Sequence, residues 1–435
     1  MRRKRYVHPI WILGLAALLS GCGSSSSSNP SNTPPPTGLK KRVLLSNVNG
    51  GVVSIIDAQR DVRSLKTVAA TSPTKMVTAG GQTAILDSTI QSILIFNNTT
   101  EVVTSQPLLA DIPTDIAITS DGKTVWVAER NNGFVQSVDT ATGIVTTSVP
   151  VPSAHRLVLS PNGTKLLAFS DDPQGLVGPN GSAVFQNAFF VIDTATANTT
   201  HQATAINLSP GDQPFSAVFG TSETQAFILN CGSGCGGNTG APSLAPTAPS
   251  VMSVDFTNAA APGLGAHAPV PAATTGLLSN GNLFVAGTTS PAAAVSPGTG
   301  FLQVLNSSSL APVGAPVQIT DGQHLFMVLA SNNHLYIGSA GCTPGPVLAN
   351  NTRVGCLSIA NVSNPAAPTV ALPAEDALRQ NFDVTGVQPI SARTVVYVVQ
   401  GGELDFFNVN TDNVDSTITP IDVVGLAFGV VQIDP

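Results

Sequence analysis

The chain has 435 residues, of which 10% are charged, and its 25 Asp and Glu outnumber its 18 Lys and Arg to give a formal net charge of -7. An acidic balance repels phosphate backbones, so nucleic acid is excluded as a partner. The remainder is dominated by Ser, Thr, Asn, Gly, Pro and small apolar residues, which favour strands and turns over helices. The composition predicts an all-β protein, with at most two helical turns at 375–382.

The N-terminus carries a targeting segment. A basic head, Arg2 to Arg5, precedes an apolar run from Ile10 to Leu19. This run is too short to span a bilayer core, which needs about 20 residues, so residues 1–21 are predicted to be a signal peptide. Its ending, Leu19-Ser20-Gly21-Cys22, resembles the lipobox of bacterial lipoproteins. That resemblance implies cleavage before Cys22 and lipidation of Cys22 by fatty acids such as palmitate, an effectively permanent membrane anchor.

Residues 22–38 are predicted to be a lipidated tether. The segment has five consecutive serines, Ser24 to Ser28, then Pro34 to Pro36, and no core-forming residue. Such a linker spans roughly 20–25 Å. Gly23 follows the anchor cysteine, and the lipoprotein resemblance then implies sorting to the outer membrane, facing the periplasm or the exterior. An ordinary signal peptide with a chance cysteine is the alternative. Loss of four basic residues on cleavage leaves 14 against 25 acidic ones, a net charge of -11.

From residue 39 to 435 the chain repeats one short apolar strand that ends in Asp or Asn. The eight endings recur about every 40–62 residues, a spacing that predicts propeller blades. An Asp or Asn side chain there can accept a hydrogen bond from backbone two residues on and so close a turn into the next strand. The endings are Asp57, Asn97, Asp139, Asp193, Asp255, Asn306, Asn361 and Asn408.

The clearest repeat runs from Pro113 to Val151. It contains four strand-forming runs separated by Asp121-Gly122, Asn132-Gly133 and Thr140-Ala-Thr-Gly143. Its run Thr124-Val-Trp-Val-Ala-Glu129 resembles the name-giving strand of YVTN-type β-propeller repeats, which implies blades of four antiparallel strands. Eight blades are favoured and seven remain open, with a β-sandwich as the competing all-β fold.

The two ends of the repeat region complement each other. The first blade begins at Val43 with what aligns as a second strand, so its innermost strand is missing. The stretch from Pro420 to Ala427 resembles the start of the clear repeat, Pro113-Thr-Asp115. We therefore expect a C-terminal strand to complete blade one and close the ring.

Four long insertions follow the expected second strands of blades four to seven. In a four-stranded blade this position and the blade-to-blade connection share one end, while the tight Asp-Gly and Asn-Gly turns are expected at the other. Insertions confined to one end are typical of a recognition surface, with tolerated decoration as the alternative. The tether should join the opposite end. The insertions are 171–183, 231–250, 288–299 and 339–354.

Four cysteines lie in these insertions or just beyond them: Cys231, Cys235, Cys342 and Cys356. Export makes disulfides the default. Three pairings are open, and the local one, Cys231 with Cys235 and Cys342 with Cys356, is favoured because closing a loop of about 15 residues contributes about 3 kcal/mol in the chain-entropy model. A zinc site is disfavoured, because the spacing of Cys231 and Cys235 does not match structural zinc motifs.

Candidate ligand-binding residues are the few charges expected near the insertion-bearing end, with solvation of exposed loops as the alternative. Calcium at Asp171-Asp172 is the one cofactor considered. His324 and His334 begin adjacent antiparallel strands and should lie about 15 Å apart, which excludes a shared metal; the other mature-chain histidines are interpreted as surface or turn residues. No catalytic or metal-ligating residue is predicted. The candidates are Glu129, Arg130, Asp171, Asp172, Asp212, Asp321 and Arg353.

The sequence leaves two functions open. The first is a monomeric, lipid-anchored binding or scaffold module of the cell envelope, which presents its disulfide-stapled loops to a protein or glycan. The second is a lactonase-like hydrolase with a metal in the central channel. Quinoprotein propellers repeat Trp in each blade, whereas the mature chain has only Trp126.

Overall fold

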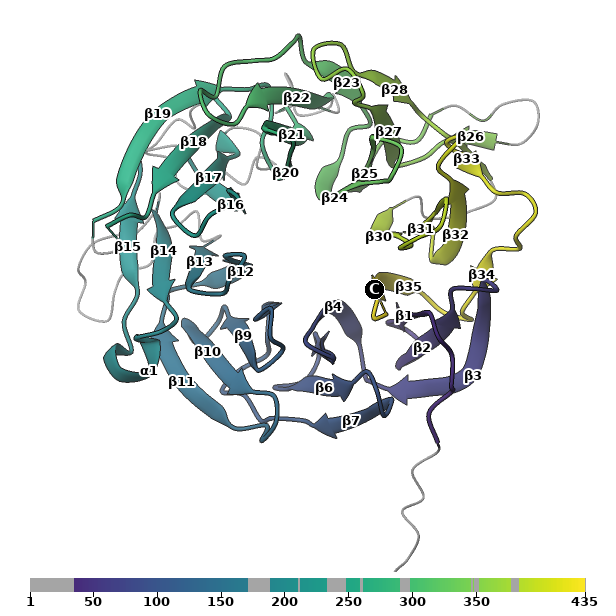
Figure 1. Cartoon of the computed structure of the whole chain (residues 1–435), viewed down its shortest axis with the longest axis horizontal. Coiled ribbons are helices and arrows are strands. Elements are labelled where there is room, and N and C mark those ends of the chain that lie inside the picture. Colours follow the sequence, from purple (N-terminus) through teal and green to yellow (C-terminus); the bar gives the residue numbers. More distant parts are fainter. Residues whose placement is uncertain are drawn as a thin grey trace, which may run out of the picture. The chain divides into compact units, whose positions relative to one another are not determined.

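Strands account for nearly all the regular structure in a computed structural model of the chain, which describes residues 35–170, 188–209, 212–232, 248–258, 261–289, 298–345, 347, 352–376 and 383–434. The signal peptide and nearly all of the tether lie outside the described residues. Residues 36–435 form one compact unit. Its described strands form nine antiparallel sheets, of which eight have four or five strands and the ninth is a two-stranded ribbon. The eight larger sheets are arranged around a central axis (Figure 1). The predicted eight-bladed propeller is confirmed.

The first four blades follow the chain from the inner strand outward, except that blade one takes its inner strand from the C-terminus. Their bounds are as follows. Blade one is β35 (Ala427–Gln432), β1 (Arg42–Asn47), β2 (Val52–Asp57) and β3 (Val62–Ala69); blade two is β4 (Pro73–Ala79), β5 (Gln82–Asp87), β6 (Ile93–Asn97) and β7 (Val102–Ser105); blade three is β8 (Asp115–Ile118), β9 (Thr124–Glu129), β10 (Phe134–Asp139) and β11 (Val145–Pro150); blade four is β12 (Ala154–Leu159), β13 (Lys165–Ser170), β14 (Ala188–Asp193) and β15 (Thr204–Asn207).

The last four blades keep the same order, with two additions. A two-stranded ribbon accompanies blade seven, and the outer strand of blade eight is split in two. Blade five is β16 (Pro214–Phe219), β17 (Gln225–Asn230), β18 (Ser250–Asp255) and β19 (Gly263–Pro269); blade six is β20 (Thr275–Ser279), β21 (Asn282–Thr288), β22 (Gly300–Asn306) and β23 (Val317–Ile319); blade seven is β24 (Gln323–Leu329), β25 (His334–Ala340), β27 (Leu357–Asn361) and β28 (Thr369–Ala371), with the ribbon β26 (Thr352–Val354) and β29 (Ala374–Asp376); blade eight is β30 (Val384–Pro389), β31 (Val395–Gln400), β32 (Glu403–Asn408), and β33 (Asn413–Val414) with β34 (Ile421–Asp422).

The eight Asp or Asn residues picked out by the repeat end the third strands of the eight blades. In each, the side-chain oxygen accepts a backbone N–H from the following turn: Asp57 Oδ1 from Gln59 at 3.0 Å, and Asn408 Oδ1 from Asn410 at 2.9 Å. The predicted turn chemistry is therefore confirmed. The short polar side chain supplies an acceptor for a backbone N–H that the turn would otherwise leave without a partner. The other six bonds follow Asn97, Asp139, Asp193, Asp255, Asn306 and Asn361.

Apolar layers fill the space between neighbouring blades. Successive residues of a strand point to opposite faces, so each blade serves two layers. Phe406 packs with the residues of blade one, and Phe407 with those of blade seven. Both are fully buried. The second and third strands are therefore nearly continuous apolar runs, as expected for strands covered on both faces.

The ring closes through β35, which pairs antiparallel with β1. The expected closure by a C-terminal strand is correct, but its predicted position at Pro420 to Ala427 is wrong: Ile421–Asp422 is β34 and pairs with β32 of blade eight. The Asn47 side chain donates to Val423 O at 2.8 Å and accepts from Leu426 N at 3.2 Å. These bonds hold the connection between blades eight and one, so the closing strand starts only after Leu426.

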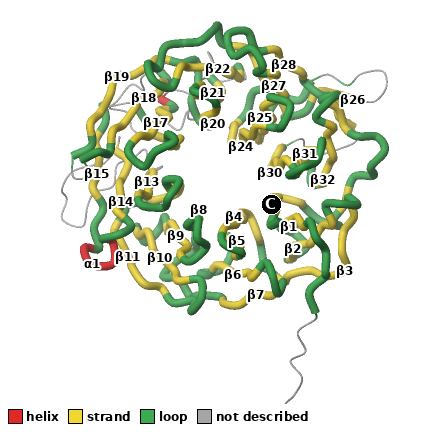
Figure 2. Tube along the Cα trace, in the orientation of Figure 1, coloured by secondary structure: helices red, strands yellow, loops and turns green. Residues whose placement is uncertain are grey.

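A short helix and the ribbon strand β29 differ from expectation. α1 (Ala197–Thr200) follows the third strand of blade four, in a segment predicted as a turn; Figure 2 shows it in red. The helical turns expected at 375–382 are contradicted where the structure describes them, since Glu375 and Asp376 belong to β29 and pair with β26. Within the described residues, no helix is long and apolar enough to cross a membrane.

The described chain enters the propeller at the end that carries the turns after the third strands. Thr37 N donates to Glu101 Oε2 at 2.7 Å, and Glu101 follows β6 in such a turn of blade two. Arg42 Nη1 lies 2.8 Å from Glu101 Oε1, and Arg42 Nη2 lies 2.7 Å from Asp434 Oδ1. Glu101 is buried. This cluster joins the first described residues, blade two and the C-terminus.

Glu101 should make stability depend on pH. Burial alone would raise the pKa of its carboxyl, but hydrogen bonds from Thr37, Arg42 and Lys66 lower it overall. A carboxyl whose pKa is lower in the folded state stabilises the folded protein at pH values above its unfolded-state pKa, which is about 4.3 for Glu. This stabilisation is lost as the pH falls through the folded-state pKa. Thermal unfolding should therefore show Glu101→Gln less stable than wild type at neutral pH, with the gap narrowing at about pH 3. A gap independent of pH would contradict this assignment.

Candidate functional site

A cavity of about 540 Å³ lies in the central channel. Seven of the eight inner strands or the residues just before them line it; only blade six contributes none. The lining comes mainly from the first residues of these strands. Each inner strand starts from a blade-to-blade connection, so the cavity lies toward the end of the channel where those connections are found.

The inner strands share an irregularity that shapes this cavity. In β4, β12, β16, β24 and β30 the register with the second strand shifts near the strand's start, which leaves one residue unpaired. Such bulges redirect a side chain relative to regular pairing. Four of the five unpaired residues line the cavity, namely Thr74, His155, Leu325 and Thr385. The fifth, Phe215, contacts the guanidinium of the lining residue Arg156.

Three charged residues of neighbouring blades meet at the cavity: Lys75 on β4, Asp115 on β8 and Arg156 on β12. Lys75 Nζ donates to Asp115 Oδ1, which also accepts from Ile116 N at 2.9 Å. Asp115 Oδ2 accepts from Leu157 N at 2.7 Å. Asp115 thus joins blades two, three and four, and both of its oxygens are engaged.

Arg156 lies over an aromatic ring. Its guanidinium carbon is 4.2 Å from the centroid of Phe215 on blade five, a cation–π contact. Burial lowers the pKa of Arg156, and the nearby charge of Asp115 partly opposes this; an arginine remains charged nonetheless. Among the described residues, its guanidinium makes no hydrogen bond or ion pair.

His155 and an apolar wall complete the lining. His155 Nδ1 donates to Phe169 O at 3.2 Å, because a carbonyl only accepts, and the imidazole is tilted against Phe215 at 6.2 Å between centroids. The interpretation of His155 as a surface or turn residue is wrong, since it lies in β12. Across the channel, the lining is mainly apolar, with Leu325, Phe326, Val387 and Val430 beside the polar Gln323 and Thr385.

Sequence reasoning missed Lys75, Asp115, Arg156 and Phe215 as site residues. They lie about 40 residues or more apart in the chain, so no local motif joins them. The signal that could have found them is their place in the repeat. Each occupies one of the first three positions of an inner strand, and an alignment of the blade starts would have put them at one level of the channel.

The predicted ligand-binding carboxylates serve the backbone of the connections. Glu129 is fully buried and accepts from Ala110 N at 3.2 Å; burial raises the pKa of Glu129, while hydrogen bonds from Asn132 and Ala110 oppose this. Asp212 Oδ2 accepts from Ser209 N at 3.1 Å, and Asp321 Oδ1 from Thr343 N at 2.7 Å. The structure does not bring these three carboxylates together in the cavity.

The other predicted charges are scattered. Arg130 is exposed after β9, and Arg353 lies on β26, where it pairs with Glu375. Asp171 and Asp172, with the proposed calcium site, lie outside the described residues. Within the part of the chain that is described, no group of three or more His, Cys, Asp and Glu side chains is placed to hold a metal.

The two histidines of blade seven are separated as predicted. His324 pairs with Ser339, five positions along β25 from His334. His324 is fully buried, and burial lowers its pKa to about 4. His334 Nδ1 lies 2.7 Å from Asp412 Oδ1 of blade eight. His201 is an exposed residue at the end of α1, and His267 lies on the outer strand β19.

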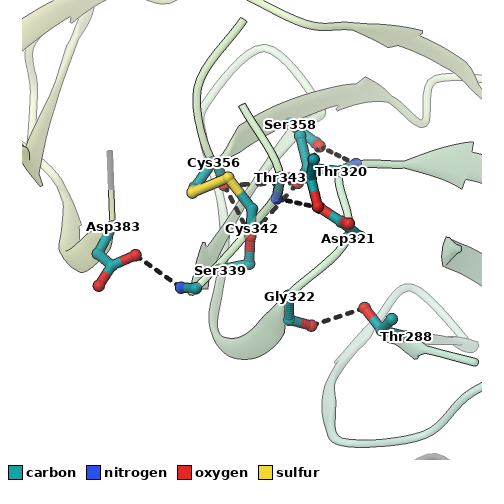
Figure 3. The surroundings of a disulfide bond; sticks show 11 residues. Thr288, Thr320, Asp321, Gly322, Ser339, Cys342, Thr343, Cys356, Ser358 and Asp383 are labelled. Atoms are coloured by element: carbon teal, nitrogen blue, oxygen red, sulfur yellow. Dashed lines mark hydrogen bonds between the residues drawn. A yellow bond between two sulfur atoms is a disulfide. The ribbon is translucent and has the colours of Figure 1, made fainter. Parts of the chain in front are cut away.

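One predicted disulfide is confirmed. Cys342 and Cys356 are bonded, with their Cα atoms 5.5 Å apart. Figure 3 shows the surrounding bonds: Ser339 Oγ donates to Cys356 O at 3.1 Å, and Gly341 N to Asp383 Oδ1 at 2.6 Å. The disulfide thus joins the two ends of the insertion of blade seven. The hydrogen bond from Gly341 to Asp383 ties this insertion to the connection that leads into blade eight. Cys235 lies outside the described residues, so its pairing with Cys231 stays a prediction.

All four long insertions follow second strands, namely β13, β17, β21 and β25. The ribbon shows which end this is. β26 lies in the insertion of blade seven, β29 lies in the connection to blade eight, and the two strands pair. The insertions therefore share the end of the ring where the inner strands and the cavity begin. We call this end the loop face. The tight turn at Asn132-Gly133 also falls there, between β9 and β10, contrary to expectation.

Comparisons with solved structures confirm the fold. Dihydro-heme d1 dehydrogenase NirN, solved with DHE, has a TM-score of 0.66 at 10% identity over 93% of this chain and 78% of its own. Apo AztD from Citrobacter koseri has a TM-score of 0.54 at 13% sequence identity, over 90% of this chain and 98% of its own. The computationally designed protein Ika8 has a TM-score of 0.53 at 9% sequence identity, over 83% of this chain and 92% of its own. No family model and no curated protein matches. These likenesses show the fold alone, an eight-bladed β-propeller.

Proposed function

We propose that the protein is a lipid-anchored binding or scaffold module of the cell envelope, which presents its loop face to a protein or glycan partner. Cys22 would carry the lipid, and outer-membrane sorting would follow from Gly23. The module works as a monomer and catalyses no reaction. It faces either the periplasm or the exterior.

The observation that carries this proposal is the separation of two faces. The four long insertions follow the second strands of consecutive blades, four to seven, and these strands all end at one end of the ring. Insertion 171–183 and most of insertions 231–250 and 288–299 lie outside the described residues. The described chain enters at the other end, where Thr37 bonds Glu101. A short tether joined there would leave the loop face directed away from the membrane, where a partner can reach it. Loops held by a rigid scaffold are the usual site of recognition.

The hydrolase alternative gains no support from the described channel. A catalytic metal site needs several protein ligands and an open position. The one carboxylate lining the described cavity is Asp115, whose oxygens already accept three hydrogen bonds.

Removing part of the largest insertion should test the proposal. The third strand of blade five begins at Ser250, so the deletion should run from Asn238 to Thr247 and spare that strand. Crosslinking on living cells, followed by mass spectrometry, should show reduced capture of the partner, with unchanged thermal unfolding of the purified protein. Leu65→Ser, on the exposed outer strand β3, serves as the control and should capture as wild type does. Capture that survives the deletion would exclude this loop as a contact.

A further inference from the structure

We propose that the channel cavity is a binding site for the carboxylate of a small organic acid, held by Arg156, with the acid's apolar part against the opposite wall. This goes beyond the proposed function, because the cavity would bind such an acid whether or not the loops hold a macromolecular partner. The ligand is a monoanion with an apolar body.

The first argument is the state of Arg156. A guanidinium has five N–H donors in a planar fork that matches a carboxylate. In the described structure it contacts the face of Phe215 at 4.2 Å and has no acceptor. Asp115 is the nearest candidate, but its oxygens are taken by Lys75, Ile116 N and Leu157 N. The cation–π contact with Phe215 holds the guanidinium at the cavity and leaves its N–H donors for a ligand.

The second argument is the local charge. Lys75 and Arg156 carry two positive charges against the one negative charge of Asp115, so the cluster has a net charge of +1. This positive site lies inside a chain whose formal charge is -7. A single positive charge in a channel with low-dielectric walls favours a monoanion. A phosphate dianion would need a second free cation, and Lys75 is already paired with Asp115.

The third argument is the shape and chemistry of the cavity. Its volume of about 540 Å³ falls in the range of small-molecule pockets, about 300–1,000 Å³. The wall opposite Arg156 includes Leu325, Phe326, Val387 and Val430. Mostly apolar walls with a few placed polar groups are typical of such sites. The bulge at Leu325 takes this residue out of regular pairing where it lines the cavity. The bulge at Phe215 does the same for the residue whose ring contacts Arg156.

Binding of simple acids to the purified full-length chain tests this inference. Benzoate and octanoate, with neutral benzamide and inorganic phosphate for comparison, should be titrated by calorimetry and by saturation-transfer NMR. We expect at least one of the two acids to bind saturably and better than benzamide or phosphate. Arg156→Gln should lower the affinity of the protein for that acid about tenfold, since a charge-assisted hydrogen-bond pair is lost. Arg156→Lys keeps the charge but not the planar fork of donors. Its affinity for that acid should therefore lie between those of wild type and Arg156→Gln.

Matched controls separate binding from folding. Arg63→Gln makes the same substitution on the exposed outer strand β3 and should bind as wild type does. Thermal unfolding of each variant shows whether the ring is intact. The inference is overturned if neither acid binds in the millimolar range, if benzamide or phosphate binds as well as the acids, or if a folded Arg156→Gln binds unchanged. None of these outcomes bears on capture of a partner by the loop face.

Discussion

Deletion of residues 427–435 should prevent the chain from forming a soluble, monomeric ring. The deletion removes β35, the inner strand of blade one, and leaves β1 as an unpaired edge. Val43, Leu44 and Leu45 on β1 are fully buried in the intact protein. An exposed apolar edge strand promotes aggregation, and the loss of the non-local pairing leaves blades eight and one unjoined. Size-exclusion chromatography and circular dichroism should show aggregated or unfolded protein.

A shorter deletion provides the control. Removing only Asp434 and Pro435 takes away the carboxylate that binds Arg42 but leaves β35 in place. This variant should remain a folded monomer and lose about 2 kcal/mol of stability. When a synthetic peptide of residues 427–435 is added during refolding, the variant that lacks these residues should form some soluble, monomeric protein again. If the longer deletion gives a monomer with wild-type unfolding, β35 does not close the ring.

Asp61→Asn should destabilise the protein by about 3 kcal/mol, because it removes one partner from a buried ionic network. Asp61 Oδ2 lies 2.8 Å from Arg393 Nη2, and Tyr397 Oη donates to Asp61 Oδ1 at 2.5 Å. Asp61 belongs to blade one, whereas Arg393 and Tyr397 belong to blade eight, so the network joins the blades that complete the ring. Asp61 has a φ of 56°, and Asn tolerates this left-handed conformation; the substitution therefore tests the charge rather than the backbone. Thermal and urea unfolding measure the loss.

Asp412→Asn is the matched control. Asp412 has a φ of 55° and occupies the same position in its own turn, four residues after Asn408 as Asp61 is after Asp57. Its carboxylate lies 2.7 Å from Nδ1 of the partly buried His334 and also interacts with Tyr336, but it has no arginine partner among the described residues. The loss should therefore be smaller, about 1 kcal/mol. The double variant Asp61→Asn with Arg393→Met should recover stability relative to Asp61→Asn alone, since no unpaired cation remains. Equal losses in the two single variants would argue against a special role for Asp61 in ring closure.

Where sequence reasoning succeeded, the relevant interactions are local. Each Asp or Asn at the end of a third strand bonds backbone two or three residues on, as Asp139 Oδ1 does with Thr142 N at 2.8 Å. A motif of this kind is visible in one short segment, so its eight copies reveal the number of blades. The disulfide between Cys342 and Cys356 was also accessible, because both residues bracket one insertion.

Where it failed, the deciding contact joins distant segments. The Pro-x-Asp likeness of Pro420 to Pro113 pointed to the wrong closing strand, because Asn47, more than 370 residues earlier, binds the connection at Val423 and Leu426. Glu129 and Asp321 are ligand candidates by sequence because they are expected near the insertion-bearing end, yet their carboxylates accept backbone N–H groups. Sequence shows that a carboxylate is present at a loop, but not which donors surround it.

The sequence by itself indicated an all-β propeller, favoured eight blades over seven, and predicted the use of both chain ends in one blade and the placement of the long insertions after second strands. Each of these follows from hydrogen-bonding and apolar patterns contained within a few residues. Only the tertiary structure decided which strand closes the ring and which charges face the channel. Lys75, Asp115 and Arg156 lie on three blades and meet only because ring closure stacks their inner strands around one axis. Their proximity is a property of the closed ring rather than of any one segment.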